Sequence, residues 1–271
     1  MVKVFEGTDK EYRMDGYLKS DLDHMKQQIK DDWDFVIIVD GLEGAGKSVF
    51  AQQIAYYLHE AKEEFSVKNI CFSGEEFRKR CQEVPQYSAV IFDESFRGLS
   101  SRGTMSKQNK NLVRMLNEVR QRNLYIILVI PSFFELDRYP AIHRSQALYH
   151  VKVDKNSKRG FFLAYGVDRK KTLYLFGKKG YNYYAAKQNY YGNYPKHYCV
   201  NENEYKKRKW NAQFEDEEEK QEGKFETRYR NYTLILMEEL KQRGLEIREI
   251  ANLLDTTPDS LYSLRKGRAS Q

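Results

Sequence analysis

The chain has few cysteines and no long hydrophobic run. Its 271 residues include three cysteines, Cys71, Cys81 and Cys199, which are too scattered for a disulfide framework or a cysteine metal site. The longest apolar run, residues 124–130, is far shorter than the ~20 residues that cross a bilayer. The first residues lack the apolar stretch of a secretory signal peptide. We therefore expect a cytoplasmic protein without a membrane partner.

Positive charge is concentrated in one segment. The net charge is +7, and residues 154–211 carry 14 Lys and Arg against 4 Asp and Glu. This pattern is compatible with a nucleic-acid partner, although many proteins are mildly basic. Residues 181–198 add seven tyrosines among Asn, Gly and Lys. Such rings either stack on bases or pack against a core or a neighbouring subunit, and both interpretations stay open.

A glycine-rich loop stands between a strand pattern and a helix pattern. Residues 41–48 fit G-x-x-x-x-G-K-[S/T], the phosphate-binding loop of nucleotide hydrolases. The β-branched run 35–39 precedes it, and the helix pattern 49–58 follows. In this order the backbone N–H groups and the helix N-terminus face the same phosphates. We therefore expect bound ATP, held by the loop residues Gly41, Leu42, Glu43, Gly44, Ala45, Gly46, Lys47, Ser48 and Val49.

Two neighbouring carboxylates follow a second buried strand pattern, residues 88–92. Asp93 and Glu94 would leave the sheet at the carboxyl end of that strand, where α/β folds bind ligands. We expect Ser48 and Asp93 to hold Mg²⁺, Lys47 to reach the β- and γ-phosphates, and Glu94 to polarise the attacking water. A solvated acidic turn is the plainer alternative. A second carboxylate that can activate water favours an ATP hydrolase over a kinase, because a kinase must keep water away from the phosphate.

Further patterns complete an α/β domain. Strand patterns at 69–73, 88–93, 124–130 and 147–153 alternate with helix patterns at 74–83 and 109–122. The alternation predicts a mostly parallel sheet with helices on both faces.

These motifs resemble those of RecA-like P-loop ATPases with an additional strand and a catalytic glutamate. The similar residues are Asp93-Glu94, 106–110, 120–132 and His143-Arg144, and the resemblance covers roughly 33–153. It extends to the zonula-occludens-toxin-like and HerA/FtsK-like ATPases of viruses, plasmids and mobile elements.

The resemblance implies a homo-oligomer, such as a ring, in which an arginine of one subunit touches the neighbour's γ-phosphate. Arg144 is the favoured candidate, Arg120 and Arg122 are the alternatives, and a plain surface arginine is the simpler interpretation for each. The resemblance also makes Ser132, after the 124–130 strand, a candidate γ-phosphate sensor. An N-cap before residues 133–135 is the other interpretation of Ser132.

The last third of the chain contains short patterns of both kinds. Residues 160–166 and 172–177 predict a β-hairpin, and the charged run 212–222 a solvated helix or a linker. Helix patterns at 229–243, 247–254 and 259–266 resemble a helix-turn-helix, with a small bundle for protein contacts as the alternative. The residues expected to face DNA are Ser260, Tyr262, Ser263, Arg265, Lys266 and Arg268.

Four regions follow: a P-loop ATPase core with a helical lead-in (1–153), a basic tyrosine-rich β appendage (154–211), an acidic linker (212–222) and a helical module (223–271). The expected fold class is α/β with a mostly parallel RecA-like sheet. The expected function is ATP hydrolysis on nucleic acid, as an oligomeric enzyme of a virus or mobile element that translocates or packages double-stranded DNA. The alternative is an ATP-switched loader, partition or replication regulator that binds DNA without translocation.

Overall fold

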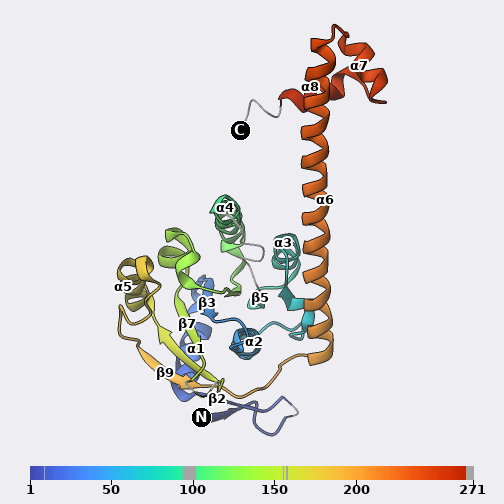
Figure 1. Cartoon of the computed structure of the whole chain (residues 1–271). Helices are drawn as coiled ribbons and strands as arrows, with labels where there is room; N and C mark the ends of the chain where they lie inside the picture. Colours follow the sequence, from blue (N-terminus) through green and yellow to red (C-terminus); the bar gives the residue numbers. More distant parts are fainter. Residues whose placement is uncertain (9, 94–101, 155, 157, 267–271) are drawn as a thin grey trace. The chain divides into compact units, whose positions relative to one another are not determined.

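The computed structural model describes residues 1–8, 10–93, 102–154, 156 and 158–266. Across these residues the chain divides into two compact units, Met1–Lys209 and Trp210–Gln271, called here the N-terminal unit and the C-terminal unit. Figure 1 shows the order of their elements along the chain. Each unit is described by itself.

In the described part of the N-terminal unit, a seven-stranded sheet has the order β4-β5-β6-β3-β7-β8-β9. The parallel strands are β3 (Phe35–Gly41), β4 (Ile70–Cys71), β5 (Ala89–Asp93), β6 (Tyr125–Val129) and β7 (Ala147–Lys152). Antiparallel strands β8 (Phe161–Tyr165) and β9 (Tyr190–Asn193) extend one edge. The prediction of a mostly parallel sheet is confirmed, and β6 lies between β3 and β5.

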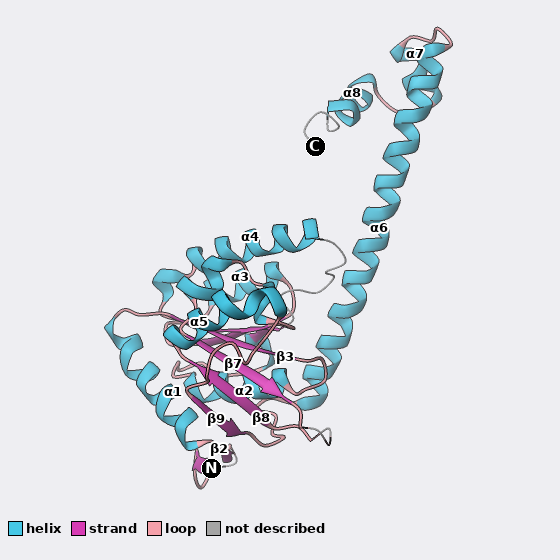
Figure 2. Cartoon of the chain, turned by 60° about the vertical axis from the view of Figure 1, so that its left-hand side comes forward, coloured by secondary structure: helices cyan, strands magenta, loops and turns pink. Residues whose placement is uncertain are grey.

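Helices cover both faces of this sheet, which is why every residue of β3, β5 and β6 is buried. On one face lie α3 (Gly74–Glu83), α4 (Arg102–Glu118) and α5 (Val167–Gly177); on the other lie α1 (Gly16–Gln28) and α2 (Lys47–Leu58) (Figure 2). Alternate strand residues such as Val36 and Ile38 pack into the core under α3, α4 and α5.

The remaining elements are short. Strand β1 (Val2–Val4) pairs with β2 (Tyr12–Met14). The short helices are η1 (Ile29–Asp31), η2 (Val67–Asn69), η3 (Arg120–Arg122), η4 (Phe133–Glu135), the π-helix η5 (Tyr139–Arg144) and η6 (Lys178–Gly180).

Two predictions for the region after residue 153 are wrong. The run 172–177 is not a strand but the second half of α5, whose buried positions Lys170, Leu173, Tyr174 and Gly177 follow helical spacing. The buried lysine conceals this spacing in the sequence. Nor is 154–211 a separate appendage, because β8 and β9 continue the main sheet and the N-terminal unit extends to Lys209.

Lys170 is fully buried, and its ammonium group donates to the carbonyl oxygens of Ala141 and Ile142. Burial lowers the pKa of Lys170 from 10.5 to about 8. Between these two pH values the unfolded chain binds a proton that the folded chain has lost, so the free energy of unfolding rises with pH.

We expect the free energy of unfolding of the wild type, relative to that of Lys170→Met, to rise by about 2 kcal/mol from pH 7 to pH 10. The measurement is urea denaturation. The neighbouring exposed Lys171 provides the control, since Lys171→Met should keep the wild-type pH dependence. A pH-independent difference for Lys170→Met would contradict the lowered pKa.

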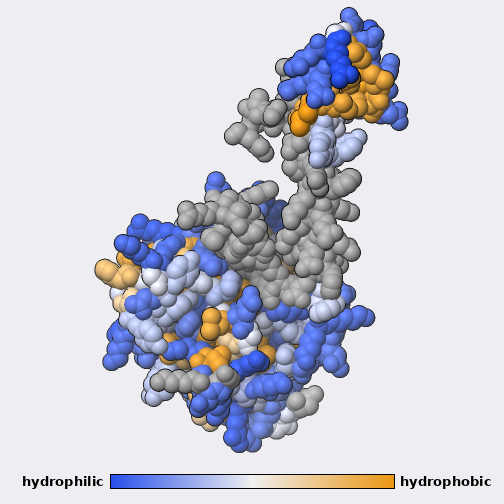
Figure 3. All heavy atoms as spheres, viewed as in Figure 1, coloured by the Kyte–Doolittle hydropathy of each residue, from blue (hydrophilic) through white to orange (hydrophobic). Residues whose placement is uncertain are grey.

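The C-terminal unit contains most of α6 (Glu202–Gln242), together with α7 (Ile247–Leu253) and α8 (Pro258–Lys266). Residues 212–222 lie within α6, so the charged run is helix rather than an extended linker. The small core of the unit consists of Leu234, Met237, Ile250, Ala251 and Leu261. The predicted helices are confirmed, and Figure 3 shows apolar residues gathered on one side of this unit.

The predicted turn between the last two helices also forms. Asp255 adopts a left-handed conformation (φ 50°), and Pro258 is the first residue of α8. The backbone N–H of Ser260 donates to Thr257 Oγ1 at 3.3 Å, which makes Thr257 the N-cap. Among the described residues, none of the helices combines the length and the apolar character that a bilayer span requires.

Candidate nucleotide and magnesium site

The predicted phosphate loop connects the end of strand β3 to the start of helix α2. Gly41 ends β3 with φ +139°, and a Cβ there would lie 2.3 Å from the carbonyl oxygen of Val151 on β7, so only glycine fits. Gly44 and Gly46 also have positive φ, at 71° and 101°. Gly46 caps α2 without a side-chain hydrogen bond, so the N–H groups of the first turn can serve an anion.

Lys47, the first residue of α2, folds back over the loop. Its Nζ donates to the carbonyl oxygens of Gly41 at 2.7 Å and Leu42 at 2.9 Å. Burial lowers the pKa of Lys47, and the nearby carboxylates of Asp40 and Asp93 oppose that effect. A phosphate above the loop would compete with these two carbonyls for the ammonium group.

Ser48 and Asp93 meet across the sheet edge as predicted. Ser48 Oγ donates to Asp93 Oδ1 at 3.1 Å, and Asp93, the last residue of β5, is fully buried. Hydroxyl and carboxylate oxygens are the donors that Mg²⁺ prefers, usually with phosphate oxygens completing its shell. Within the described residues no group of three or more His, Cys, Asp or Glu could hold a metal. The hydroxyl and the carboxylate could hold Mg²⁺ together with phosphate oxygens of a nucleotide.

Tyr205 and Lys209, at the start of α6, also contact Asp93. The Tyr205 hydroxyl donates to Asp93 Oδ2 at 2.8 Å, and Lys209 Nζ lies 3.3 Å from both Asp93 Oδ2 and Ser48 Oγ. Burial and the Asp93 charge raise the pKa of Tyr205. Neither residue is recognisable from the sequence, because no local motif links positions 205 and 209 to position 93. Their one-turn spacing on a helix was the only available signal.

Tyrosines of the basic segment support the loop. The ring of Tyr194 stacks on Phe50 of α2 with centroids 4.5 Å apart, and its hydroxyl donates to the carbonyl oxygen of Ala45 at 3.1 Å. Tyr194 therefore has the structural role that was one of the two open interpretations. Large exposed fractions leave the other interpretation open for Tyr181, Tyr184 and Tyr191.

Ser132 begins η4 as an N-cap, because its Oγ accepts the backbone N–H of Phe134 at 3.3 Å. The Tyr183 hydroxyl lies 3.3 Å from Ser132 Oγ and donates to Asp40, beside the phosphate loop. His150 Nδ1 lies 2.9 Å from the same carboxylate, and its ring stacks on Tyr183. The N-cap interpretation is confirmed, and phosphate sensing by Ser132 stays a prediction.

Arg144 does not have the position expected of an arginine that reaches a neighbouring subunit. It is 6% exposed and forms a two-pronged ion pair with Asp34, with one N–O distance of 3.1 Å. It also donates to the carbonyl oxygen of Leu116. A side chain in this position is not exposed for contact with another subunit, and the role of Arg144 between subunits stays a prediction. Of the alternatives, Arg122 donates to the carbonyl oxygen of Val84, and Arg120 is exposed.

Several predicted site residues are not placed. Glu94 and Arg268 lie outside the described residues. Ser260 and Tyr262 are exposed on α8, and Tyr262 has an exposed fraction of 47%. The positions of Ser263, Arg265 and Lys266 within α8 are described, but their side chains are not.

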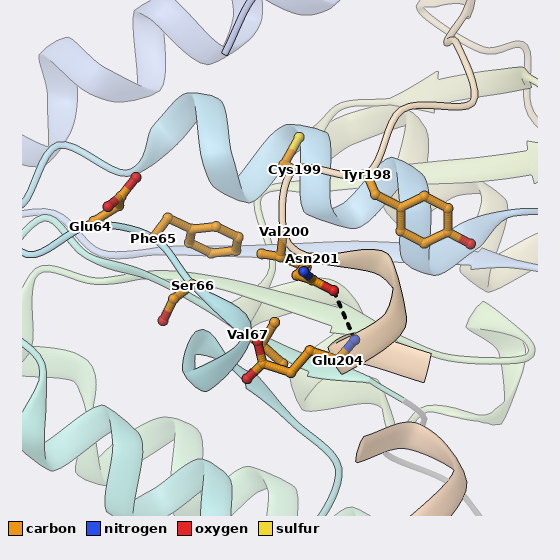
Figure 4. Close-up of a pocket in the computed structure, with 9 residues that line it drawn as sticks. All are labelled: Glu64, Phe65, Ser66, Val67, Tyr198, Cys199, Val200, Asn201 and Glu204. Atoms are coloured by element: carbon orange, nitrogen blue, oxygen red, sulfur yellow. Dashed lines mark hydrogen bonds between the residues drawn. The ribbon is translucent and has the colours of Figure 1, made fainter. Parts of the chain in front are cut away.

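A shallow pocket of about 340 Å³ lies beside the start of α6, lined by residues 64–67, 198–201 and Glu204. Figure 4 shows the N-cap of α6 at its edge, where Asn201 Oδ1 accepts the backbone N–H of Glu204 at 3.0 Å. None of the nine lining residues belongs to the phosphate loop. The pocket marks incomplete packing between the α6 start and the segment that follows α2.

No protein-family model matches the chain, and no curated protein matches it. A structural match is the N-terminal domain of zonular occludens toxin from Neisseria meningitidis, with 14% identity and a TM-score of 0.33 over 50% of this chain and 85% of that one. A DNA polymerase III gamma subunit-related protein from Thermotoga maritima has 12% identity and a TM-score of 0.33, over 50% and 47%.

The flagellar accessory protein FlaH from Methanocaldococcus jannaschii has 15% identity and a TM-score of 0.25, over 53% of this chain and 83% of that one. These likenesses are too slight to assign a function to this chain.

Proposed function

We propose that this protein is an ATP hydrolase of the P-loop class. The observation that carries the proposal is the contact between Ser48 of the glycine loop and Asp93 at the end of β5, at 3.1 Å. Ser48 and Asp93 are 45 residues apart in the sequence, and their contact places two oxygen ligands suited to Mg²⁺ beside the phosphate-binding loop. The insertion of β6 between β3 and β5 supports the additional-strand class of these enzymes.

The residues divide the chemistry as follows. The loop N–H groups and Lys47 bind the phosphates, and Ser48 and Asp93 hold Mg²⁺. Bound Mg²⁺ neutralises charge on the β- and γ-phosphates. Glu94, directly after Asp93, accepts a proton from the attacking water.

We further propose that ATP hydrolysis by this protein is coupled to work on DNA, as in a translocating or packaging enzyme. The support is the basic stretch 154–211 and the turn-linked helices α7 and α8, whose proposed DNA face includes Ser260 and Tyr262. The ATP-switched loader or regulator is the second candidate. The burial of Arg144 favours it, because the residue expected to complete a neighbour's site in a ring has a structural role instead.

Duplex DNA should raise the rate of ATP hydrolysis several-fold. The double charge reversal Arg265→Glu with Lys266→Glu should abolish this stimulation without changing the basal rate, because phosphate contacts depend on positive charge. The measurement is phosphate release with and without DNA.

Lys241→Glu with Arg243→Glu is the matched control, since these residues lie in the same unit but outside the proposed recognition helix. Equal loss of stimulation in both double variants would indicate nonspecific charge. Strand displacement by the wild type would favour translocation, and stable ATP-dependent complexes without movement would favour the switch.

A further inference from the structure

The Lys209 ammonium group lies between the two oxygens that are proposed to bind Mg²⁺. Its Nζ is 3.3 Å from Ser48 Oγ and 3.3 Å from Asp93 Oδ2. Tyr205, one helical turn earlier, donates to the same carboxylate oxygen at 2.8 Å. We propose that the first turns of α6 block the nucleotide site, an arrangement called here the plug. In the plug the Lys209 ammonium group occupies the proposed Mg²⁺ position, and ATP–Mg²⁺ must displace it. This inference rests on the proposed function.

The charge balance explains why a cation belongs there. The Asp93 carboxylate is completely buried, whereas the Lys209 side chain is 24% exposed. A buried carboxylate is costly unless a positive partner and hydrogen bonds satisfy it. Lys47 lies nearby but is bound to the loop carbonyls of Gly41 and Leu42. Lys209 is therefore a direct counter-charge of Asp93.

The ammonium group and Mg²⁺ cannot both use these oxygens. Mg²⁺ binds its oxygen ligands at about 2.0–2.1 Å and requires near-octahedral geometry. An ammonium group within hydrogen-bonding distance of the same two oxygens takes their lone pairs and repels a second cation. Binding of ATP–Mg²⁺ thus requires Lys209 to leave Ser48 and Asp93.

The contacts that hold the α6 start are suited to displacement. Arg208 pairs with Glu76 and donates to the carbonyl oxygen of Val67, and Tyr205 meets the ring of Phe72 with centroids 6.0 Å apart. The Arg208 contacts are polar, the ring pair is tilted, and Val67 also lines the shallow pocket (Figure 4).

Lys209→Met should tighten binding of a fluorescent ATP analogue in the presence of Mg²⁺. If the plugged state holds about 90% of the molecules, its loss lowers the apparent Kd about tenfold. Lys206→Met is the matched control, because Lys206 lies on the same helix but is exposed and pairs with Glu202. The control should bind like the wild type, and Lys209→Arg, which keeps the charge, should also stay close to the wild type.

A second readout is the melting temperature measured first without nucleotide. In EDTA, Lys209→Met should melt at a lower temperature than the wild type, because Asp93 loses its cation. Mg²⁺ with the ATP analogue should remove this difference. Tyr205→Phe keeps the ring but loses the hydroxyl, so it should tighten binding less, and it tests the plug if Lys209→Met does not fold.

The outcomes separate the two proposals. Weaker nucleotide binding by Lys209→Met would show that Lys209 contacts the phosphates and would overturn the plug, as would unchanged affinity. In both cases the wild type still binds ATP, and the proposed function stands. If folded wild-type protein and every variant fail to bind nucleotide, the proposed function fails and the plug with it.

Discussion

The variant Glu94→Gln should bind ATP with wild-type affinity and hydrolyse it about 10²–10⁴-fold more slowly. Glu94 follows Asp93, whose carboxylate contacts Ser48 of the phosphate loop at 3.1 Å. A glutamine has nearly the same size but cannot accept the proton of the attacking water. Binding is measured with a fluorescent ATP analogue, and turnover by phosphate release.

Glu43→Gln provides the matched control for this change. Glu43 is an exposed carboxylate of the phosphate loop, and its neutralisation should leave turnover near that of the wild type. Lys47→Ala should instead weaken ATP binding itself, because Lys47 is the loop's phosphate ligand. Wild-type turnover by Glu94→Gln would mean that another group activates the water.

Arg144→Leu should lower the free energy of unfolding by about 3–5 kcal/mol, because it leaves the Asp34 carboxylate buried without its partner. Arg144 and Asp34 are 6% and 8% exposed, and Asp34 immediately precedes β3, which leads into the phosphate loop. The measurement is urea denaturation monitored by circular dichroism. Where folded protein remains, its ATP affinity should be close to that of the wild type.

The double variant Arg144→Leu with Asp34→Leu should regain much of the lost stability, since neither charge is then left alone. Arg120→Leu, at an exposed position of η3, is the control and should change stability by less than about 0.5 kcal/mol. A small stability loss for Arg144→Leu, together with a large loss of turnover only in the oligomer, would support Arg144 as an arginine acting between subunits.

Local patterns in the sequence were sufficient for the elements that build the sheet. The continuous apolar runs at 89–92 and 124–130 correspond to β5 and β6, because a strand that is buried on both faces is apolar at every position rather than at alternate ones. The glycines at 41, 44 and 46 predicted the conformation of the phosphate loop, since all three have positive φ, which glycine adopts most easily. The start of α8 likewise depends on neighbouring residues, since Pro258 is its first residue and Thr257 is its N-cap.

The sequence by itself therefore determined the phosphate loop, the acidic strand end and the alternation of strands with helices, because each depends on residues within one or two turns of chain. Only the tertiary structure decided that Arg144 pairs with Asp34, 110 residues away, and that Lys209 reaches Asp93 across 116 residues. A side chain's partner at such separations depends on how the strands are ordered and where helices return over them. No spacing along the chain encodes that geometry, so arginine and lysine look alike in sequence whether they lie in solvent or neutralise a buried carboxylate.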